Sequence, residues 1–590
     1  MNFLRKRAWP LTLATCALLV LASKVLLIAY AAPRVPFLDQ WDGIARDLFV
    51  PLLEGRLTIA DLWRIHNEHS LILTRLHTLV LYWVNDKQWD PLVENYANAL
   101  LHVVVFVGIT SLFRSVFRGV GQWWLLLGFF IVWMSPHAYE NTLWGMQNAF
   151  YYLLGASIAA IYCLIVYRPF SRGWFLGMFL AAFAIISQRS GLLAPLSAGI
   201  VLGFRGFVRS VDRRDLTASL LLLSVTAAVL VFVPSHANDT LKASSVPEFL
   251  RALGVALAWP WIRSVWVAGF MLVPLLLWFG NLAGRRSTLE DRDYFLLGSW
   301  LLIGGNVVAI AWFRCRDVCY LTSRHSELLA IMVPLSVACW ATLIHFRKGI
   351  HRSILVGGAI LWGLATTTGM IVLGAHCIGG DIRDRHVAWP KQVAFVRQVS
   401  LNPSPSLWAG KNPMDAASFG PQPVVDLLSR SSFKNILPWR AQVSQSADMT
   451  NYALDAGAWR IANDQTGEPQ WQLPVGQPPT AWRSQPTIAK RSESRLPIRG
   501  DWRGSRVALT MILADGKRIN LWTGNAIHHE WYFVQIPAPV GASYQLELNS
   551  TVDHGNVEIS SVRSLGKLSA LCDLISGIVV APSPGSGTPP

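Results

Sequence analysis

Two carboxylates three residues apart are the first groups in this chain that could do chemistry. Asp39 and Asp42 lie just beyond the first apolar segment, and on a helix they would share one face. A carboxylate placed just outside a membrane helix can act as a general base or bind a cation. A capping residue with an ion pair from Asp42 to Arg46 is the alternative. Because Phe37 and Trp41 surround the pair with apolar bulk, where a free carboxylate is costly, we favour a functional role.

A second polar run follows in the same outer segment. The sequence His66-Asn67-Glu68-His69 leads directly into the apolar stretch 70–84. Any of these groups could bind a polar ligand at the bilayer surface, and the two histidines could ligate a metal. A plain helix cap supplied by Glu68 is the alternative. No spacing in the chain indicates a zinc site, and a divalent cation remains open.

Two further outer loops carry isolated polar groups. Glu140 stands between Tyr139 and Trp144, with Gln147 close behind, which suggests a wall for a carbohydrate or another polar ligand. A capping loop at the membrane interface is the alternative. Arg189 lies at the tip of an expected helical hairpin, where it is either an interface anchor or a phosphate ligand.

A late outer loop contains arginines on the side where basic residues are not expected. Arg314, Arg316 and Arg324 contradict the bias that keeps positive charge inside the cell. Arginine forms bidentate contacts with phosphate, so an anionic lipid-linked substrate would explain them. His325 follows directly. Simple interfacial anchoring is the alternative.

The composition predicts that membrane helices position these residues. Charged residues make up 15% of the 590 residues and hydrophobic residues 52%, with a mean hydropathy of +0.37. These values exclude disorder and disfavour a soluble enzyme. Because a span needs roughly 20 apolar residues, we expect about eleven transmembrane helices. They are at 9–31, 96–113, 121–135, 148–167, 174–187, 190–204, 216–233, 263–281, 294–312, 326–344 and 353–375.

Basic residues predict the orientation of these spans. With the N-terminus inside, every second loop is rich in arginine or lysine, as cytoplasmic loops are. Much of the net charge of +16 is therefore explained by topology and implies no nucleic acid. We expect a multi-pass protein of a bacterial inner membrane, with a retained first span, a cytoplasmic N-terminus and a periplasmic C-terminal domain. The stretch 70–84 is short and contains Arg75, so we expect an interfacial helix there.

The tail after residue 375 loses the long apolar runs. We expect an α-containing connector at 376–450, a β-sandwich-like domain at 451–578 and a disordered end at 579–590. Asp515-Gly516 is a strong hairpin signal. Carbohydrate binding by this domain is open, as is disulfide pairing of Cys315 with Cys319 or of Cys377 with Cys572.

The order of these features resembles the membrane glycosyltransferases of the GT-C superfamily. It looks most like the protein O-mannosyltransferases and the aminoarabinose transferases that act on lipid A. In that class an acidic motif follows the first span, here Asp39-Gln40-Trp41-Asp42. Two interfacial helices come next, here about 40–55 and 70–84. The resemblance covers roughly residues 1–375, which would form the transmembrane domain with 33–95 as its first periplasmic loop.

Later residues extend the resemblance with departures. The class often has a second outer acidic residue, here Glu140, and an Arg-Tyr-like motif near the lipid phosphate, here Arg324-His325. The usual Asp-Glu pair is replaced by Asp-x-x-Asp, the usual His-Pro-Pro or Lys-Pro step is missing from residues 66–69, and a histidine replaces the tyrosine.

The resemblance implies an inverting transfer of a sugar from a polyprenyl-phosphate donor to a glycan, lipid or protein acceptor. Asp39 or Asp42 would take the acceptor proton, while Arg324 steadies the leaving phosphate. No cofactor is certain on this model. A transporter or flippase of a lipid-linked glycan and a non-catalytic membrane scaffold are the alternatives. The sugar, the acceptor and the oligomeric state are not revealed.

Overall fold

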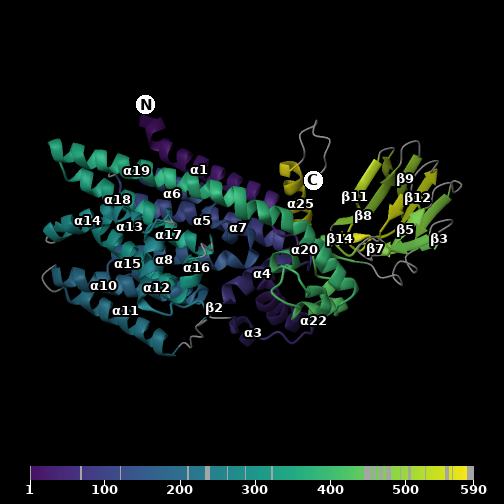
Figure 1. Cartoon of the computed structure of the whole chain (residues 1–590), viewed down its shortest axis with the longest axis horizontal. Helices are drawn as coiled ribbons and strands as arrows, with labels where there is room; N and C mark the ends of the chain where they lie inside the picture. Colours follow the sequence, from purple (N-terminus) through teal and green to yellow (C-terminus); the bar gives the residue numbers. More distant parts are fainter. Residues whose placement is uncertain are drawn as a thin grey trace. The chain divides into compact units, whose positions relative to one another are not determined.

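The computed structural model is mostly helical and ends in a β-rich region (Figure 1). It forms two compact units: unit 1 contains residues 1–31, 59–76 and 95–384, and unit 2 contains residues 32–58, 77–94 and 385–590. Most of the predicted first outer loop therefore groups with the tail. The structure describes residues 2–66, 69–119, 121–208, 212–232, 240–261, 264–285, 288–319, 323–443, 453–455, 460–463, 469–473, 480–491, 493–501, 506–524, 527–551, 557–560 and 562–580.

Unit 1 is built almost entirely from helices. Short 3₁₀ turns link several of them, and one two-stranded hairpin joins β1 (Ile65–His66) to β2 (His69–Ser70). The helices are α1 (Asn2–Ala31), α3 (Ile59–Trp63), α6 (Gln122–Met134), α7 (Tyr139–Leu143), α8 (Asn148–Val166), α9 (Arg172–Ser187), α10 (Leu193–Val208), α11 (Arg213–Phe232), α12 (Val246–Leu257), α13 (Val267–Met271), α14 (Val273–Gly284), α15 (Asp291–Phe313), α16 (Cys315–Cys319), α17 (Ser326–Ala330), α18 (Met332–His345) and α19 (Gly349–Cys377). Helices α4 (Ile72–Val84), α5 (Pro91–Val116) and α20 (Arg383–Leu401) have residues in both units.

Within the described residues, eight helices are long and apolar enough to cross a membrane. They correspond to eight of the eleven predicted spans, so a multi-pass membrane protein is the supported class. The predicted spans 121–135 and 174–187 are shorter apolar helices, α6 and α9. The predicted span 263–281 is interrupted, because α13 ends at Met271 and α14 begins at Val273, with Pro274 in its first turn.

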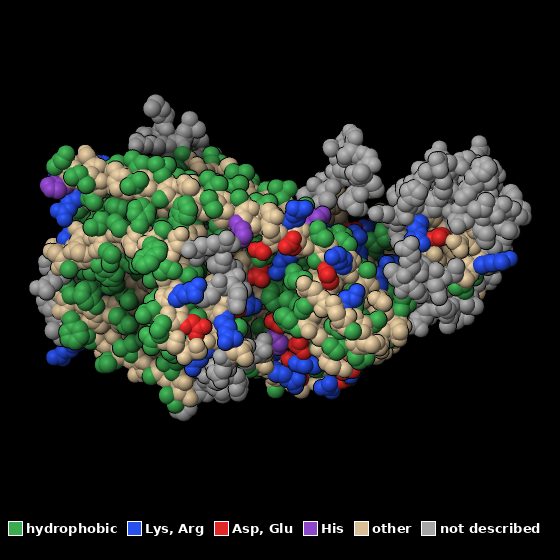
Figure 2. Space-filling model, viewed as in Figure 1, with side chains coloured by type: hydrophobic (Ala, Val, Ile, Leu, Met, Phe, Trp, Pro, Cys, Tyr) green, Lys and Arg blue, Asp and Glu red, His purple; other side chains and the backbone are tan. Residues whose placement is uncertain are grey.

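The surface of unit 1 is apolar where a bilayer would meet it. Phe179, Leu220 and Val231 are all more than 60% exposed, which water would disfavour. Figure 2 shows apolar side chains covering much of the visible face of these helices, with few charged groups among them. This surface is what a lipid environment requires.

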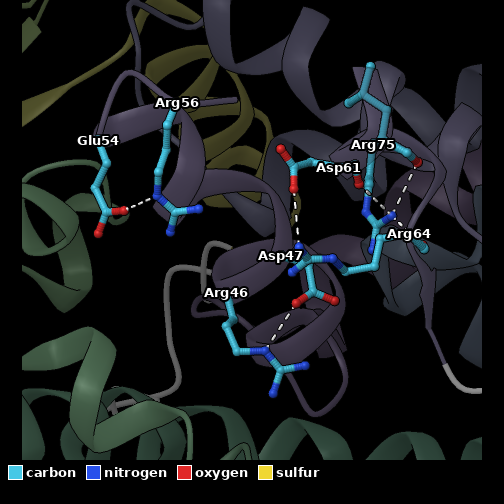
Figure 3. A network of polar contacts seen from close by, with 8 residues as sticks. Arg46, Asp47, Glu54, Arg56, Asp61, Arg64 and Arg75 are labelled. Carbon is cyan, nitrogen blue, oxygen red and sulfur yellow. Dashed lines mark hydrogen bonds and ion pairs between the residues drawn. The ribbon is translucent and has the colours of Figure 1, made fainter. Parts of the chain in front are cut away.

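Arg75 shows how a charged residue fits in an apolar helix. Its guanidinium is fully buried in unit 1, and Nη1 donates to the backbone oxygens of Asp61 and Leu62 at 3.1 Å and to that of Arg64 (Figure 3). These carbonyls lie at the C-terminal end of helix α3, where the Asp61 carbonyl also accepts from the Arg64 N–H at 3.3 Å. Arg75 therefore caps α3, and α4 begins at Ile72 after the hairpin.

We expect Arg75→Leu to lower the free energy of unfolding by about 2–4 kcal/mol, because the Leu62 and Arg64 carbonyls lose the buried Arg75 donor and the Asp61 carbonyl keeps only the Arg64 N–H. Thermal unfolding of the detergent-solubilised protein measures this loss. Arg64→Leu is the matched control, since its half-exposed ion pair with Asp61 contributes less than about 1 kcal/mol. Equal stability of the two variants would contradict the capping role.

Unit 2 begins with an unusual helix. Residues Gln40–Phe49 (η1) form a π-helix, in which the Val50 N–H donates to the Ala45 carbonyl five residues back, and α2 (Val50–Leu53) continues it. π-Helical hydrogen bonding is rare, and it is mostly seen in single-turn π-bulges, which are frequent at functional sites. Further helices before the sheets are η8 (Pro405–Trp408), α21 (Pro413–Ala416), α22 (Val424–Leu428), α23 (Ser431–Lys434) and η9 (Trp439–Ala441). The segment predicted as an α-containing connector thus contains several short helices.

Two antiparallel sheets follow and share one core. The first has the order β10 (Arg518–Gly524), β9 (Arg506–Leu513), β12 (Ser543–Thr551), β6 (Thr480–Ser484) and β3 (Ala453–Asp455), with β7 (Thr487–Ile488) beside β12. The second has the order β11 (Ile527–Ile536), β8 (Glu493–Asp501), β13 (Val557–Ile559), β5 (Pro469–Leu473) and β4 (Arg460–Asn463), with β14 (Arg563–Leu565) beside β8.

Alternate residues of both sheets form the shared core. Ile498 of β8, Met511 of β9 and Leu546 of β12 are all fully buried in it, as expected for a sandwich. The hairpin predicted at Asp515-Gly516 joins β9 to β10, and Gly516 has a φ of +81°. The side chains of Trp522, Trp531 and Tyr532, the aromatic residues of this domain that carbohydrate binding would use, lie outside the described residues.

The last segment of the predicted β domain is a helix and not a strand. Residues Lys567–Val580 form helix α25, and Ser569, Cys572 and Ser576, which are spaced by three and four residues, lie on its buried face. Cys572 and Cys377 are free thiols, so the structure contains no disulfide between them. Cys315 is also a thiol, which donates to the Glu248 carbonyl at 3.7 Å.

Candidate functional site

Asp317 joins the outer arginines of unit 1. Its Oδ2 lies 2.7 Å from Arg324 Nη2, 3.6 Å from Arg314 Nη1 and 3.4 Å from His325 Nε2. Burial alone would raise the pKa of Asp317, but the His325 hydrogen bond and the Arg324 charge outweigh it and hold the pKa well below its usual value. Two guanidinium groups thus share one ionised carboxylate at this point.

Glu140 meets the same segment from the other side. Its Oε2 accepts from the Arg324 N–H at 3.0 Å and from the Ser323 hydroxyl at 3.2 Å, while its own N–H donates to Ser323 Oγ at 3.0 Å. These bonds tie α7 to the 3₁₀ turn η6 (Ser323–His325). Glu140 therefore positions the turn that carries Arg324 and His325. We call Glu140, Arg314, Asp317, Arg324 and His325 the arginine cluster.

A chain of hydrogen bonds leads from this cluster into the membrane spans. Asn141 Nδ2 donates to the Arg324 carbonyl at 2.9 Å and lies 3.4 Å from Glu327 Oε2. Glu327 Oε1 lies 3.0 Å from His102 Nε2. All of these groups except Arg324 are buried. Lys24 on α1 is also buried and donates to the Ser135 carbonyl at 3.2 Å, so the helices enclose a polar interior.

His137 is a buried base beside this interior. It lies on the 3₁₀ turn η2 (Pro136–Ala138), and its ring packs edge-on against Trp259 at a centroid distance of 5.0 Å. Within the part of the chain that the structure describes, neither ring nitrogen has a hydrogen-bond partner. Burial lowers the pKa of His137 to about 3, against the opposing charge of Glu327.

We expect His137 to make the folded state sensitive to acid. Because its folded pKa lies below the unfolded value of about 6.5, its stability contribution is complete above that pH and is lost as the pH falls towards 3. The free energy of unfolding should fall by about 2 kcal/mol between pH 7 and pH 5 from this group alone. Thermal unfolding of His137→Phe should show a correspondingly smaller pH dependence, whereas the exposed His351→Phe should match the parent protein. Identical pH dependence in the parent and His137→Phe would contradict this assignment.

The acidic motif lies in unit 2 on the π-helix η1. Asp39 begins the helix without capping it through its side chain, and Asp39 and Asp42 are both partly exposed. Asp42 Oδ1 lies 2.9 Å from Arg46 Nη1, as the spacing predicts. Arg46 Nε also lies 3.0 Å from Asp47 Oδ1 (Figure 3). The ion pair is therefore present, and both carboxylates remain partly open to solvent.

The residues between the two carboxylates point into the protein. Gln40 and Trp41 are fully buried, and Trp41 Nε1 donates to the Ala417 carbonyl at 3.0 Å. Gln40 Nε2 donates to Glu94 Oε2 at 2.7 Å. Trp41 is also among the residues predicted to bind substrate, and in the structure its ring is enclosed and its N–H donates to the protein backbone.

The other predicted ligands are spread over unit 1. Gln147 is buried in the 3₁₀ turn η3 (Gly145–Gln147). Arg189 begins the turn η4 (Arg189–Leu192), and its Nη1 is buried without a partner among the described residues. His66 pairs with His69 across the β1–β2 hairpin. Glu68 and the His69 side chain lie outside the described residues.

The structure therefore brings Glu140 together with Arg314, Arg324 and His325, which the sequence places in a different loop. It also adds Asp317, Asn141 and Glu327, to which the sequence alone assigns no role in the site. The signal available for Asp317 was its position among three arginines in an outer loop. Within the described residues, no group of three or more His, Cys, Asp or Glu side chains is placed to hold a metal ion.

Compared with known proteins, the chain matches no family model, no curated protein and no solved structure.

Proposed function

We propose that the chain is a multi-pass membrane glycosyltransferase that takes its sugar from a polyprenyl-phosphate donor. The observation that supports this proposal most is the setting of the Arg324 side chain. Its Nη2 lies 2.7 Å from Asp317 Oδ2, yet 23% of the side-chain surface is exposed. A guanidinium fixed in place and open to a ligand suits a phosphate oxygen. Arg314 places a second positive charge beside the same Asp317 carboxylate.

The proposed reaction is one inverting substitution. An acceptor hydroxyl forms a bond to the anomeric carbon while the bond from that carbon to the phosphate oxygen breaks. The acceptor proton passes to Asp39 or Asp42, and the electron pair leaves with the polyprenyl phosphate. Arg324 stabilises the negative charge that develops on the phosphate. Asp317 keeps the guanidinium oriented, and Glu140 holds the turn beneath it.

The location belongs to the same proposal. We place the protein in a bacterial inner membrane with its N-terminus in the cytoplasm, as the distribution of basic loops favours. The arginine cluster and the sandwich then lie on the periplasmic side. The acceptor is a glycan, a lipid or a protein, and a divalent cation remains an open requirement.

A binding experiment tests the donor assignment. The protein in lipid nanodiscs is titrated with a polyprenyl monophosphate and, separately, with the uncharged polyprenol of the same length. We expect saturable binding of the monophosphate at least about 10-fold tighter than of the alcohol, because each arginine contact to phosphate is charge-assisted. Equal binding of both lipids would contradict a phosphate site.

A transporter of a lipid-linked glycan is the second candidate. The buried pair of His102 and Glu327, with Lys24 inside the same unit, favours it, because ionisable groups inside membrane spans frequently mark transport paths. Reconstituted vesicles separate the two candidates. A transporter moves a headgroup-labelled lipid-linked glycan across the bilayer without an acceptor, and Glu327→Gln abolishes that movement. A transferase needs an acceptor and releases polyprenyl phosphate.

A further inference from the structure

Glu94 is a buried carboxylate whose hydrogen bonds all come from neutral groups. It is 2% exposed, and its Oε1 accepts from Thr78 Oγ1 at 2.7 Å and Trp89 Nε1 at 3.1 Å. Its Oε2 accepts from Gln40 Nε2 at 2.7 Å. A buried charge is costly, so a position with no other role would favour an apolar residue. The carboxylate instead fixes three donors from separate parts of unit 2.

Gln40 connects Glu94 to the backbone through hydrogen bonds at both ends of its side-chain amide. It is fully buried, and its Oε1 accepts from the Phe37 N–H at 3.0 Å while its Nε2 is held by Glu94. Phe37 lies just before the turn into the π-helix, and Gln40 directly follows Asp39. One amide side chain therefore ties Glu94 to the backbone on the N-terminal side of Asp39.

A second anchor holds the same turn through strained backbone. Leu38 has a φ of +47° and Ala417 a φ of +55°, a region that residues with a side chain rarely adopt. The Leu38 N–H donates to the Ala417 carbonyl at 2.7 Å, and Trp41 Nε1 donates to the same oxygen. Such strain persists only where the surroundings impose it, and it occurs often at functional sites.

The two anchors hold the buried residues of the acidic motif, and its two carboxylates lie on the exposed side. Gln40 and Trp41 are held inside the protein, whereas Asp39 and Asp42 are partly exposed. We infer that the Glu94–Gln40 pair and the Leu38–Ala417 contact form a positioning lock that fixes the direction of Asp39 and Asp42. None of the locking residues has to touch substrate, so they are positioning residues. This inference rests on the proposed function only for its effect on catalysis.

Exchanging the two locking side chains tests the pair. In Glu94→Gln, the new amide cannot accept at both ends, so any orientation of the two amides leaves one hydrogen bond unmade. In Gln40→Glu, two carboxylates face each other. The double variant Gln40→Glu with Glu94→Gln restores every bond, because residue 94 now donates to residue 40 and still accepts from Thr78 and Trp89.

The readouts are local hydrogen exchange and steady-state transfer. We expect amide exchange of residues 37–49 to rise by about 10-fold in each single variant and to return to the parent rate in the double variant. Exchange in strands β8, β9 and β12 should stay unchanged. The kcat should fall by about 10- to 100-fold in each single variant with KM for the donor unchanged, because misdirected catalytic groups slow the chemical step. Gln398→Glu on the exposed face of α20 is the matched control.

Two substitutions at Ala417 test the contact between Leu38 and Ala417. Ala417→Gly keeps the carbonyl and adopts the left-handed conformation without strain, so exchange and kcat should match the parent. Ala417→Val adds bulk at a fully buried position and a β-branched side chain to a left-handed residue, so exchange of residues 37–49 should rise by about 10-fold.

The outcomes separate the lock from the proposed function. If the parent protein transfers no sugar, the transferase assignment fails, and the exchange measurements still decide the lock. Unchanged exchange in both single variants, or a double variant as impaired as either single one, would overturn the lock.

Discussion

Asp39→Asn and Asp42→Asn are expected to differ sharply in activity from the parent protein while folding as it does. Loss of the general base should lower kcat for glycan transfer by about 10²–10⁴-fold. Both side chains are partly exposed, and asparagine keeps their size, so insertion and thermal stability should stay close to those of the parent. Transfer of labelled sugar from the polyprenyl-phosphate donor measures the effect.

The pair of variants also identifies the base. The variant with the larger loss of kcat identifies the carboxylate that takes the acceptor proton. Asp515→Asn in the exposed β9–β10 hairpin is the control and should retain full activity. Full transfer in both Asp39→Asn and Asp42→Asn would remove the acidic motif from the mechanism.

Arg324→Met is expected to lower kcat/KM for the donor by about 10²–10³-fold, the usual loss when one group that stabilises transition-state charge is removed. Methionine preserves much of the length of the side chain but cannot bind phosphate. Asp317 would keep Arg314 and His325 as partners. Steady-state kinetics with varied donor concentration give the effect.

Arg316→Met is the matched control for Arg324. Arg316 lies on the same short helix as Asp317 but is exposed and lies outside the arginine cluster. We expect its kcat/KM to stay within about 3-fold of the parent, because a peripheral charge acts mainly through long-range attraction. Equal losses in the two variants would indicate general attraction of an anionic lipid in place of a defined phosphate contact.

Local patterns in the sequence predict much of the fold. Long apolar runs predict eight helices that match candidate spans, and the spacing of Asp42 and Arg46 predicts their ion pair. The Asp515-Gly516 turn predicts the β9–β10 hairpin. Each of these signals acts between residues that are close in sequence, where composition and spacing decide the geometry.

Long-range contacts could not be predicted in the same way. Glu140 meets Ser323 and Arg324 only because two helices pack together, and no local pattern encodes that meeting. The pairing of Gln40 with Glu94 has the same origin. The sequence does not separate helix α25 from the β domain, because its apolar residues directly follow a series of strands.

A density map of the protein with bound polyprenyl monophosphate would show directly whether Arg324 binds the phosphate of the donor. We expect a phosphate within hydrogen-bonding distance of the Arg324 guanidinium, with Asp317 still bound to the same side chain and the density lost in Arg324→Met. Phosphate density at saturating lipid that contacts neither Arg324 nor Arg314 would contradict it.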